Sequence, residues 1–438
     1  MNKILKINRK IDSFKKIINV EGDKSLSIRW VLISSLSKKK SVALNLLKSE
    51  DVMSAINCIK LLGSKVKFSN NKCEIIGNGL HKNFKKELVL DAGNSGTLGR
   101  LILGLLINSN KKIKLIGDKS LSKRDFSRVT IPLKKFGAEF SRSKNLPLEM
   151  KGTNNPKPIN YLEKKGSAQC KTTIMLAALK SEGVTTIKAK KSRDHTELMF
   201  KYLKIPIIIK KNNKKFDQIK IHGVKKVSPL NYKIPGDISS CAFFIVLTLL
   251  SKNSQLLIKN ININPTRIGI IKILKMMGGS IKFLNKRSYK GEKISDIFIK
   301  SSKNLKGINC PVRFNSSAID EFLVIFLVAA RSRGTSYFKD LSELNQKESP
   351  RLKWASKILN FMGIKNVMTK SSIKIVGNPN LELKKKINIR NFSKDHRVFM
   401  MSVIAALTCG GKWKINDLDS IKTSFPKFLE ILKKIEHQ

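Results

Sequence analysis

A helix–turn–strand pattern recurs six times along this chain of 438 residues. In each copy, apolar residues at i, i+3, i+4 and i+7 predict an amphipathic helix, which ends at a glycine or a turn. A short β-branched strand follows, except in the sixth copy, which comprises the helical segment alone. The copies begin roughly 70 residues apart. The six segments are 52–63, 129–137, 195–203, 267–279, 351–363 and 425–435.

This repeat favours an α/β fold with two domains of three units each. The chain is too long for one ordinary core, so two domains are also expected from length alone. Pro235-Gly236 is a plausible crossing point between the halves. The predicted division places residues 22–233 in one domain, and residues 1–21 together with 234–438 in the other.

Composition places the chain in the cytoplasm and away from membranes. Its longest apolar runs, 241–250 and 322–330, are far shorter than a membrane span. The N-terminus has no long apolar stretch typical of a signal peptide. The six cysteines show no CxxC spacing and no pairing with histidine. They are therefore predicted to be reduced, mostly buried thiols, and no metal site is expected.

The formal net charge of +56 is extreme. Nucleic-acid binding is one interpretation of such a charge. However, lysines are spread over the whole chain, aromatic residues make up only 7%, and lysine, isoleucine and asparagine are all abundant, as in proteins from AT-rich genomes. These observations favour compositional drift over nucleic-acid binding as the origin of the charge, which would still attract small anionic substrates.

Arginine is more selective: eight of the 15 arginines lie in a few polar segments. In these segments, the planar guanidinium group of arginine can bind a phosphate or carboxylate through two parallel hydrogen bonds.

The segment 91–100, Asp-Ala-Gly-Asn-Ser-Gly-Thr-Leu-Gly-Arg, combines a short strand, a glycine turn and the start of an apolar helix. Such an arrangement presents backbone N–H groups and a favourable dipole to an anion. Taken singly, the segment is equally typical of a capped turn. Four similar segments increase its significance: 21–30, 117–125, 166–173 and 192–197.

Two acidic segments stand out in this basic chain. Asp320 and Glu321 precede an apolar helix over 322–330, and Glu348 precedes a second helix, with Ser349 predicted as its N-cap and Pro350 at its first position. Carboxylates at such positions are commonly partners of the helix dipole. The segments 395–397 and 423–426 each open a further helix, and no Walker or dinucleotide-binding motif is present.

Taken in order, these segments resemble the family of 3-phosphoshikimate 1-carboxyvinyltransferases, the EPSP synthases. The resemblance covers essentially the whole chain. It rests on GDKSLSIR, DAGNSGT, GDKSLSKR, SAQCK, SRDHTE, PGDISSCAFF, NPTR, IDE, QKESPRL, DHR and TSFP. It implies a two-domain inside-out α/β barrel fold, in which each domain has three βαβαββ units and the active site is the interdomain cleft.

The resemblance also implies a reaction. The enolpyruvyl group of phosphoenolpyruvate is transferred to the 5-hydroxyl of shikimate 3-phosphate, through a tetrahedral intermediate, with release of phosphate. No metal or organic cofactor is implied. The expected partners are these two small anions, with no nucleic acid and no membrane, and the expected state is a cytoplasmic monomer.

Residue roles follow from the matching motifs. The predicted catalytic residues are Asp320 as base on the 5-hydroxyl, Glu348 as proton donor or acceptor at the vinyl carbon, and Lys24, which is shared by both substrates. The predicted ligands of shikimate 3-phosphate are Lys24, Ser25, Arg29, Ser167, Ala168, Gln169, Ser192, Asp320 and Lys347. The predicted ligands of phosphoenolpyruvate are Lys24, Asn94, Gly96, Arg124, Gln169, Arg351, Arg397 and Lys422. Arg193 is a further candidate at the shikimate phosphate, whereas Arg100 is expected to be a structural brace.

The chemistry agrees with this assignment. Two polyanions must be held together against their repulsion, which requires basic clamps and helix N-termini. Addition to an enol ether followed by elimination takes one proton in and one out, so two carboxyl-type groups are expected.

Several positions depart from the family pattern. Pro350 replaces an acidic or amide residue, Ala168 replaces a serine of some members, and Leu98-Gly99 replaces a small residue and a methionine. A lysine of some members aligns with Thr423, one position from Lys422. The sister family of UDP-N-acetylglucosamine enolpyruvyl transferases is disfavoured, because it relies on a cysteine in the loop equivalent to 111–124, which contains none.

Overall fold

The computed structural model describes residues 3–80, 86–212 and 216–436. The chain divides into two compact units. Unit 1 comprises Met1–Glu21, Pro235–Ser288 and Lys293–Gln438, and unit 2 comprises Gly22–Ile234 and Tyr289–Glu292. Each unit has its own apolar core. The short segment 289–292 is counted in unit 2, although the sequence-based division placed it with residues 234–438.

Unit 2 is built from sheets that share one pairing pattern. In each, the first two strands are parallel and the others are antiparallel. Among the described residues there are three such sheets. Their strands, in spatial order, are β14 (Tyr232–Lys233), β3 (Ser41–Leu44), β5 (Lys72–Ile76) and β4 (Lys65–Ser69); β6 (Leu88–Asp91), β7 (Lys112–Ile116), β9 (Leu148–Lys151) and β8 (Glu139–Arg142); and β10 (Asn160–Glu163), β11 (Val184–Ala189), β13 (Asp217–His222) and β12 (Ile207–Lys210).

Unit 1 also has three sheets in the part of the chain that the structure covers. Two of them contain one parallel strand pair, whereas in the third sheet the strands Thr335–Phe338, Ile373–Val376 and Asn366–Met368 pair only in antiparallel fashion. Their strands, in spatial order, are β16 (Ser280–Tyr289), β17 (Glu292–Lys300), β15 (Gln255–Asn262) and β2 (Lys15–Asn19); β18 (Thr335–Phe338), β20 (Ile373–Val376) and β19 (Asn366–Met368); and β1 (Leu5–Ile7), β22 (Gly410–Ile415) and β21 (Leu383–Ile389).

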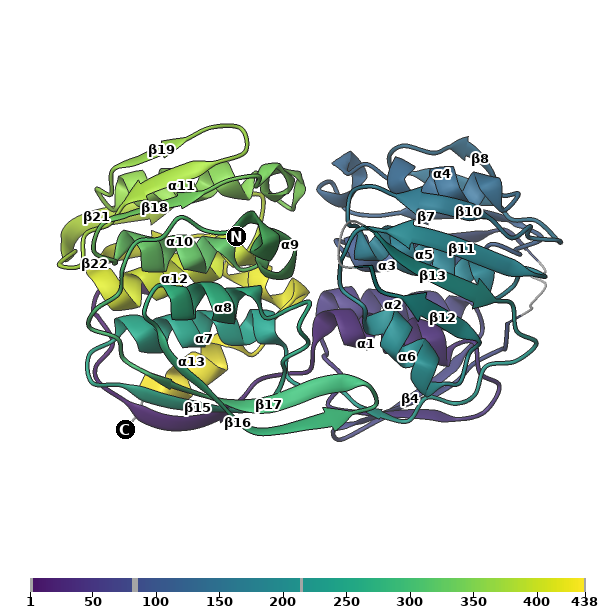
Figure 1. Ribbon diagram of the computed structural model, residues 1–438, viewed down its shortest axis with the longest axis horizontal. Helices are drawn as coiled ribbons and strands as arrows, with labels where there is room; N and C mark the ends of the chain where they lie inside the picture. Colours follow the sequence, from purple (N-terminus) through teal and green to yellow (C-terminus); the bar gives the residue numbers. More distant parts are fainter. Residues whose placement is uncertain (1–2, 81–85, 213–215, 437–438) are drawn as a thin grey trace. The chain divides into compact units, whose positions relative to one another are not determined.

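Three inner helices fill the centre of each unit, and the sheets lie outside them (Figure 1). They are α1 (Lys24–Ser34), α3 (Gly96–Leu105) and α5 (Ala168–Ala178) in unit 2, and α7 (Ile238–Leu250), α10 (Phe322–Ala330) and α12 (His396–Cys409) in unit 1. Every residue of α7, α10 and α12 is buried. A helix that is apolar on all sides must be covered on all sides. The arrangement confirms the inside-out α/β fold.

The six helix–turn–strand segments form the outer helices and the strands that follow them. These helices are α2 (Glu50–Leu61), α4 (Ser127–Lys135), α6 (His195–Tyr202), α8 (Gly269–Met276), α11 (Arg351–Phe361) and α13 (Phe428–Glu436). Gly63, Gly137, Gly278 and Gly363 all have positive φ just after such a helix, and Lys204 takes this role after α6. The left-handed residue explains why glycine marks the repeat. Short 3₁₀ segments complete the fold: Leu121–Lys123, Val312–Phe314, Ser342–Gln346 and Leu418–Thr423, together with the short helix α9 (Asn315–Ala318).

In unit 2, the close packing of the inner helices α3 and α5 depends on Gly104. A Cβ added to Gly104 of α3 would lie 2.2 Å from the backbone oxygen of Thr173 on α5. The absence of a side chain therefore lets the two inner helices approach backbone to backbone.

One predicted helix start is wrong. Ser349 is not the N-cap of α11, because the cap position is taken by Pro350 and makes no side-chain capping bond. The hydroxyl of Ser349 instead donates to Asp395 Oδ2 at 2.8 Å. A buried carboxylate from another element outcompetes the local cap.

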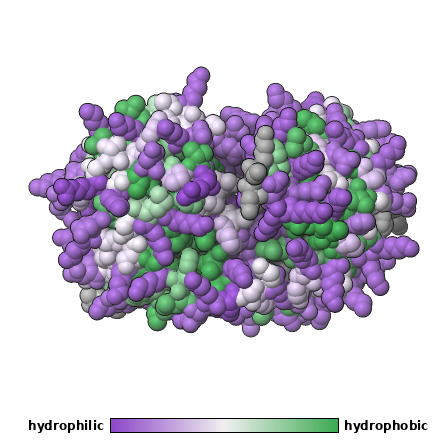
Figure 2. All heavy atoms as spheres, in the orientation of Figure 1, coloured by the Kyte–Doolittle hydropathy of each residue, from purple (hydrophilic) through white to green (hydrophobic). Residues whose placement is uncertain are grey.

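Polar side chains cover most of the visible surface, with scattered apolar patches (Figure 2). Among the described helices, none is long and apolar enough to span a membrane.

Candidate active site

Most of the predicted ligands in unit 2 lie at the N-terminal ends of the inner helices. Each of these helices carries a side-chain cap on the first turn: Asp23 Oδ1 accepts from Leu26 N at 2.9 Å, Ser95 Oγ from Leu98 N at 3.2 Å, and Ser167 Oγ from Cys170 N at 3.2 Å. One cap leaves further N–H groups of the first turn available, and the helix dipole favours an anion there.

Lys24 and Arg29 project from α1. The Lys24 ammonium lies 2.9 Å from Asp51 Oδ2, and the Lys24 side chain is 18% exposed. Arg29 is 3% exposed, and its Nε donates to Thr196 Oγ1 at 3.0 Å while Nη1 donates to the backbone oxygen of Ser25 at 3.0 Å. Both cations are thus held in place by neighbouring residues and remain near the start of the helix.

Asn94, Gly96 and Arg124 lie together where α3 begins. Asn94 Nδ2 donates to Asp118 Oδ2 at 2.6 Å, and Arg124 Nη2 lies 3.4 Å from Asn94 Oδ1. A Cβ on Gly96 would be 3.0 Å from Arg124 Nη1 and 3.1 Å from Arg100 Nη1. Two guanidinium groups therefore crowd against the bare backbone of Gly96, and the space is suited to an anion.

Arg100 braces this region, as the sequence indicated. Its Nη1 donates to Gln169 Oε1 at 2.6 Å, and its guanidinium stacks over the Phe126 ring at 5.2 Å. Gln169 Nε2 in turn donates to Thr97 Oγ1 at 3.0 Å. Gly99 makes room for the ring, since an added Cβ would lie 3.3 Å from Phe126. Gly99, one of the two positions that depart from the family pattern, thus leaves space for the Phe126 ring, over which Arg100 stacks.

The start of α5 carries Ser167, Ala168 and Gln169. The buried carboxylate of Glu163 accepts from the backbone N–H groups of Gly166 at 2.6 Å and Ser167 at 3.0 Å, which fixes the turn before the helix. Ser192, which precedes α6, is 8% exposed, and its hydroxyl has no hydrogen-bond partner among the described residues. A buried hydroxyl in this state is available to a ligand.

Cys170 lies in the first turn of α5 but is not suited to nucleophilic chemistry. Burial raises the pKa of its thiol to about 12. The protein therefore holds a neutral thiol at this helix start at physiological pH.

A second cluster, in unit 1, is centred on Arg351. This side chain is 2% exposed, and its guanidinium contacts three carboxylates: Asp395 at 2.9 Å from Nε, Asp320 at 3.5 Å from Nη1, and Glu348. Burial alone would lower the pKa of Arg351, but the charges of Asp395, Glu348 and Asp320 raise it overall. The two predicted proton-transfer groups are thus held by one permanently charged side chain.

Asp320 has a second cationic neighbour, since Lys347 Nζ lies 3.2 Å from its Oδ1. Arg397 Nη1 donates to the backbone oxygen of Asp320 at 2.7 Å. The side chain of Asp320 is 15% exposed and that of Glu348 is 16% exposed, so both carboxylates are accessible to a ligand.

Lys422 lies apart from the contacts just described. It is 53% exposed and pairs with Asp419 at 2.7 Å within the 3₁₀ segment Leu418–Thr423. Thr423 Oγ1 lies 3.4 Å from His396 Nδ1, next to Arg397 at the start of α12. The predicted role of Lys422 stays a prediction.

Asp395 is the main contact residue of the cluster around Arg351 that the sequence did not reveal. It is fully buried, caps α12 by accepting from Arg397 N at 3.0 Å, and binds Arg351 through both oxygens. Its position before an apolar helix could have predicted its role as a cap. Its pairing with Arg351, 44 positions away in the sequence, could not be predicted from local spacing. Across the described residues, no group of three or more His, Cys, Asp or Glu side chains is arranged to hold a metal ion.

The fold itself is that of the enolpyruvyl transferases. The structure resembles the solved enolpyruvyl transferase NikO from Streptomyces tendae with a TM-score of 0.77, covering 99% of this chain and 98% of that one. At 13% identity this likeness concerns the fold alone. It also resembles EPSP synthase from Acinetobacter baumannii, with a TM-score of 0.85, 32% identity and coverage of 99% and 98%.

The chain belongs to the EPSP synthase (3-phosphoshikimate 1-carboxyvinyltransferase) family, whose model matches residues 8–432. The 3-phosphoshikimate 1-carboxyvinyltransferase of Caldicellulosiruptor bescii is 38% identical, with 97% of this chain and 98% of that protein covered. The enzyme of the same name from Petrotoga mobilis is 37% identical, with 95% and 96% covered.

Proposed function

We propose that the clusters in the two units form the substrate and proton-transfer sites for one reaction. As a member of its family, the enzyme transfers the enolpyruvyl group of phosphoenolpyruvate to shikimate 3-phosphate in the shikimate pathway. The observation that carries the site assignment is the buried guanidinium of Arg351, which contacts both Asp320 and Glu348.

In the proposed addition step, Asp320 removes the proton of the shikimate 5-hydroxyl. The oxygen forms a bond to C2 of phosphoenolpyruvate, and Glu348 delivers a proton to C3. The developing charge needs fixed cations nearby, and Arg351, Arg397 and Lys24 are charged side chains already held by neighbouring groups.

In the proposed elimination step, the C2–O bond to phosphate breaks and a proton leaves C3. Glu348 accepts that proton, which restores its starting state. The leaving phosphate takes up the proton that Asp320 removed from the 5-hydroxyl, so it departs as HPO4²⁻ and Asp320 is returned to its starting state. The basic side chains around Gly96 stabilise the charge of the departing phosphate.

In the proposed substrate site of unit 2, shikimate 3-phosphate is bound by Lys24, Ser25, Arg29 and the starts of α5 and α6. Phosphoenolpyruvate is bound by Asn94, Gly96 and Arg124 there, and by Arg351 and Arg397 in unit 1. The contacts that support this proposal are the anchored cations and helix starts described above.

The decisive assay is phosphate release on mixing shikimate 3-phosphate with phosphoenolpyruvate. Asp320→Ala should lower kcat by about 10²-fold or more, because a positioned base is lost, while both substrates still bind measurably. Glu430→Ala, which removes an exposed carboxylate paired with Lys434, is the matched control and should leave kcat unchanged. Unaltered turnover in Asp320→Ala would remove this residue from the mechanism.

We also propose a cytoplasmic monomer that binds no nucleic acid. Its cysteines are all free and buried, which suits a reducing compartment. Light scattering should give a mass near 49.3 kDa, whereas twice that mass would contradict the monomer.

A further inference from the structure

The hairpin formed by β16 and β17 ends in a tip that belongs to unit 2, residues 289–292. The tip is tightly attached within that unit. Lys290 Nζ lies 4.4 Å from the ring centre of Tyr202 and 5.4 Å from that of Tyr289, and the Tyr289 hydroxyl accepts from Lys233 N at 2.9 Å. A Cβ on Gly291 would touch Leu198 of α6 at 3.4 Å. The tip is therefore packed directly against α6.

The tip also makes a fully buried contact between a carboxylate and a histidine. The carboxylate of Glu292 lies 2.6 Å from Nδ1 of His195, and both side chains are fully buried. A carboxylate at such a position requires a partner, because the desolvation cost of a bare charge is large. The contact between Nδ1 and the carboxylate fixes the orientation of the imidazole ring.

His195 is the first residue of α6, and the next two residues each contact an inner helix: Thr196 contacts Arg29 of α1, and Glu197 contacts Lys171 of α5. Thr196 Oγ1 accepts from Arg29 Nε at 3.0 Å and lies 2.8 Å from Thr172 Oγ1. Glu197 pairs with Lys171 at 2.5 Å, and both of these side chains are at most 5% exposed. A shift in this turn would therefore move the acceptor that orients the Arg29 guanidinium.

We propose that Glu292 is a positioning residue for shikimate 3-phosphate, acting through His195 and Thr196 on Arg29. The proposal rests on the proposed role of Arg29 in binding that substrate. Glu292 itself contacts no substrate. Its function is to hold the first turn of α6 so that Arg29 keeps the orientation that a bidentate contact with an anion requires.

The test compares Glu292→Gln and Glu292→Ala with the unchanged enzyme in steady-state assays at varied concentrations of each substrate. Loss of the contact should raise KM for shikimate 3-phosphate about tenfold in Glu292→Ala and less in Glu292→Gln, because glutamine keeps an acceptor oxygen. KM for phosphoenolpyruvate and kcat should stay within about twofold. Equal effects on both substrates, or none, would overturn the proposal.

A double-mutant cycle tests the route. Thr196→Val removes the acceptor for Arg29 Nε, so adding Glu292→Ala to it should raise KM for shikimate 3-phosphate by much less than the product of the single effects. The pairing of Glu292→Ala with Arg124→Lys should instead be multiplicative. Multiplicative behaviour with Thr196→Val would show that Glu292 does not act through Thr196.

The matched control is Lys290→Met at the same hairpin tip. It weakens the attachment to the tyrosine rings but leaves the contact between Glu292 and His195 intact. An unchanged KM for shikimate 3-phosphate in this variant supports the proposal. A rise as large as in Glu292→Gln would contradict it, because the effect would then come from the attachment of the whole tip and not from Glu292.

Calorimetric titration of shikimate 3-phosphate gives a readout independent of turnover, and circular dichroism shows whether each variant is folded. If the unchanged enzyme released no phosphate from the two substrates, the proposed function would fail. If it did, but binding to the Glu292 variants were normal, only the present proposal would fail.

Discussion

Gly96 is the residue at which the smallest change should have the most selective effect. An added Cβ would be 3.0 Å from Arg124 Nη1 and 3.1 Å from Arg100 Nη1, and both atoms are at the ends of flexible side chains. We predict that Gly96→Ala displaces these groups by a few tenths of an ångström and raises KM for phosphoenolpyruvate roughly tenfold. KM for shikimate 3-phosphate should stay within about twofold.

The control for this prediction is Gly104→Ala. There the new Cβ would lie 2.2 Å from the backbone oxygen of Thr173, which cannot move aside. It should lower the melting temperature clearly, whereas Gly96→Ala should change it by about 2 °C or less. A loss of thermal stability in Gly96→Ala, or a similar rise in both KM values, would contradict the interpretation.

Residues proposed for the site were recognisable in the sequence where they follow a glycine turn and precede an apolar run, as Lys24, Asn94 and Gln169 do. The partners that hold them were not. Lys24 pairs with Asp51, and Arg351 pairs with Asp395. Each partner lies on another element, so no local spacing in the sequence predicts the pair. Ser349 shows the same limit, because its interaction with Asp395 replaces the predicted cap.

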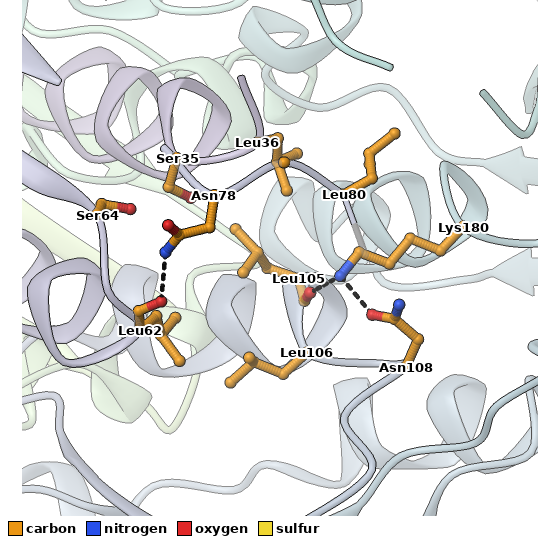
Figure 3. Close-up of a pocket in the computed structure, with 11 residues that line it drawn as sticks. Ser35, Leu36, Leu62, Ser64, Asn78, Leu80, Leu105, Leu106, Asn108 and Lys180 are labelled. Carbon is orange, nitrogen blue, oxygen red and sulfur yellow. Dashed lines mark hydrogen bonds between the residues drawn. The ribbon is translucent and has the colours of Figure 1, made fainter. Parts of the chain in front are cut away.

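At the scale of elements, the two ends of the inner helices of unit 2 differ in their surroundings. Their N-termini carry the predicted substrate ligands, and their C-termini surround a small cavity of about 30 Å³ that is lined by Ser35, Asn78, Asn108 and Lys180 among others (Figure 3). Lys180 Nζ donates to Asn108 Oδ1 at 2.6 Å and to the backbone oxygen of Leu105, the last residue of α3. Unit 1 has a counterpart, since Arg331 Nη1 donates to the backbone oxygen of Thr408 in the last turn of α12 at 2.9 Å. In both units a basic side chain donates to a carbonyl oxygen at the C-terminal end of an inner helix.

Lys180 should make stability depend on pH. Burial lowers the pKa of its ammonium to about 7, against about 10.4 in an unfolded chain. Between these values the unfolded state binds a proton that the folded state does not, so the free energy of unfolding rises with pH across this window. Below about pH 7 both states are protonated and the full cost of burying the charge, at most a few kcal/mol, is present.

The measurement is urea unfolding of the unchanged protein and Lys180→Met from about pH 6 to about pH 10. The methionine variant loses hydrogen bonds at every pH, so its free energy of unfolding is compared with that of the unchanged protein at each pH. As pH rises, the free energy of unfolding of the unchanged protein should increase relative to that of the variant. For Lys434→Met, at an exposed lysine, the difference in free energy of unfolding from the unchanged protein should not vary with pH. If the difference for Lys180→Met were also independent of pH, the prediction would be refuted.

The repeating elements were largely visible in the sequence. The six amphipathic segments and their terminal glycines predicted the outer helices because packing against one apolar face leaves a periodic signal. The fully buried helices α7 and α10 carry no such periodicity, and only their apolar runs marked them. The assignment of residues 289–292 to unit 2 depends on contacts with Tyr202 and His195, which lie far away in the sequence.

At the scale of the whole molecule, the net charge of +56 should act on the rate of substrate capture. Both substrates are anions, and a surface dominated by hydrophilic side chains, most of the charged ones basic, attracts them over distances beyond direct contact (Figure 2). Salt screens this attraction, since the Debye length falls to about 10 Å at 0.1 M ionic strength. Bonds within the site are shorter than this length and are screened much less.

We therefore predict that kcat/KM for each substrate falls about tenfold between about 20 mM and about 300 mM KCl, while kcat changes little. Potassium acetate at equal ionic strength should act alike, because screening does not depend on the identity of the anion, whereas competition at the phosphate site would. Sucrose at matched viscosity controls for diffusion. If kcat/KM were independent of salt, capture would depend only on the arginines and lysines of the site, and the excess charge of the chain would have no part in catalysis.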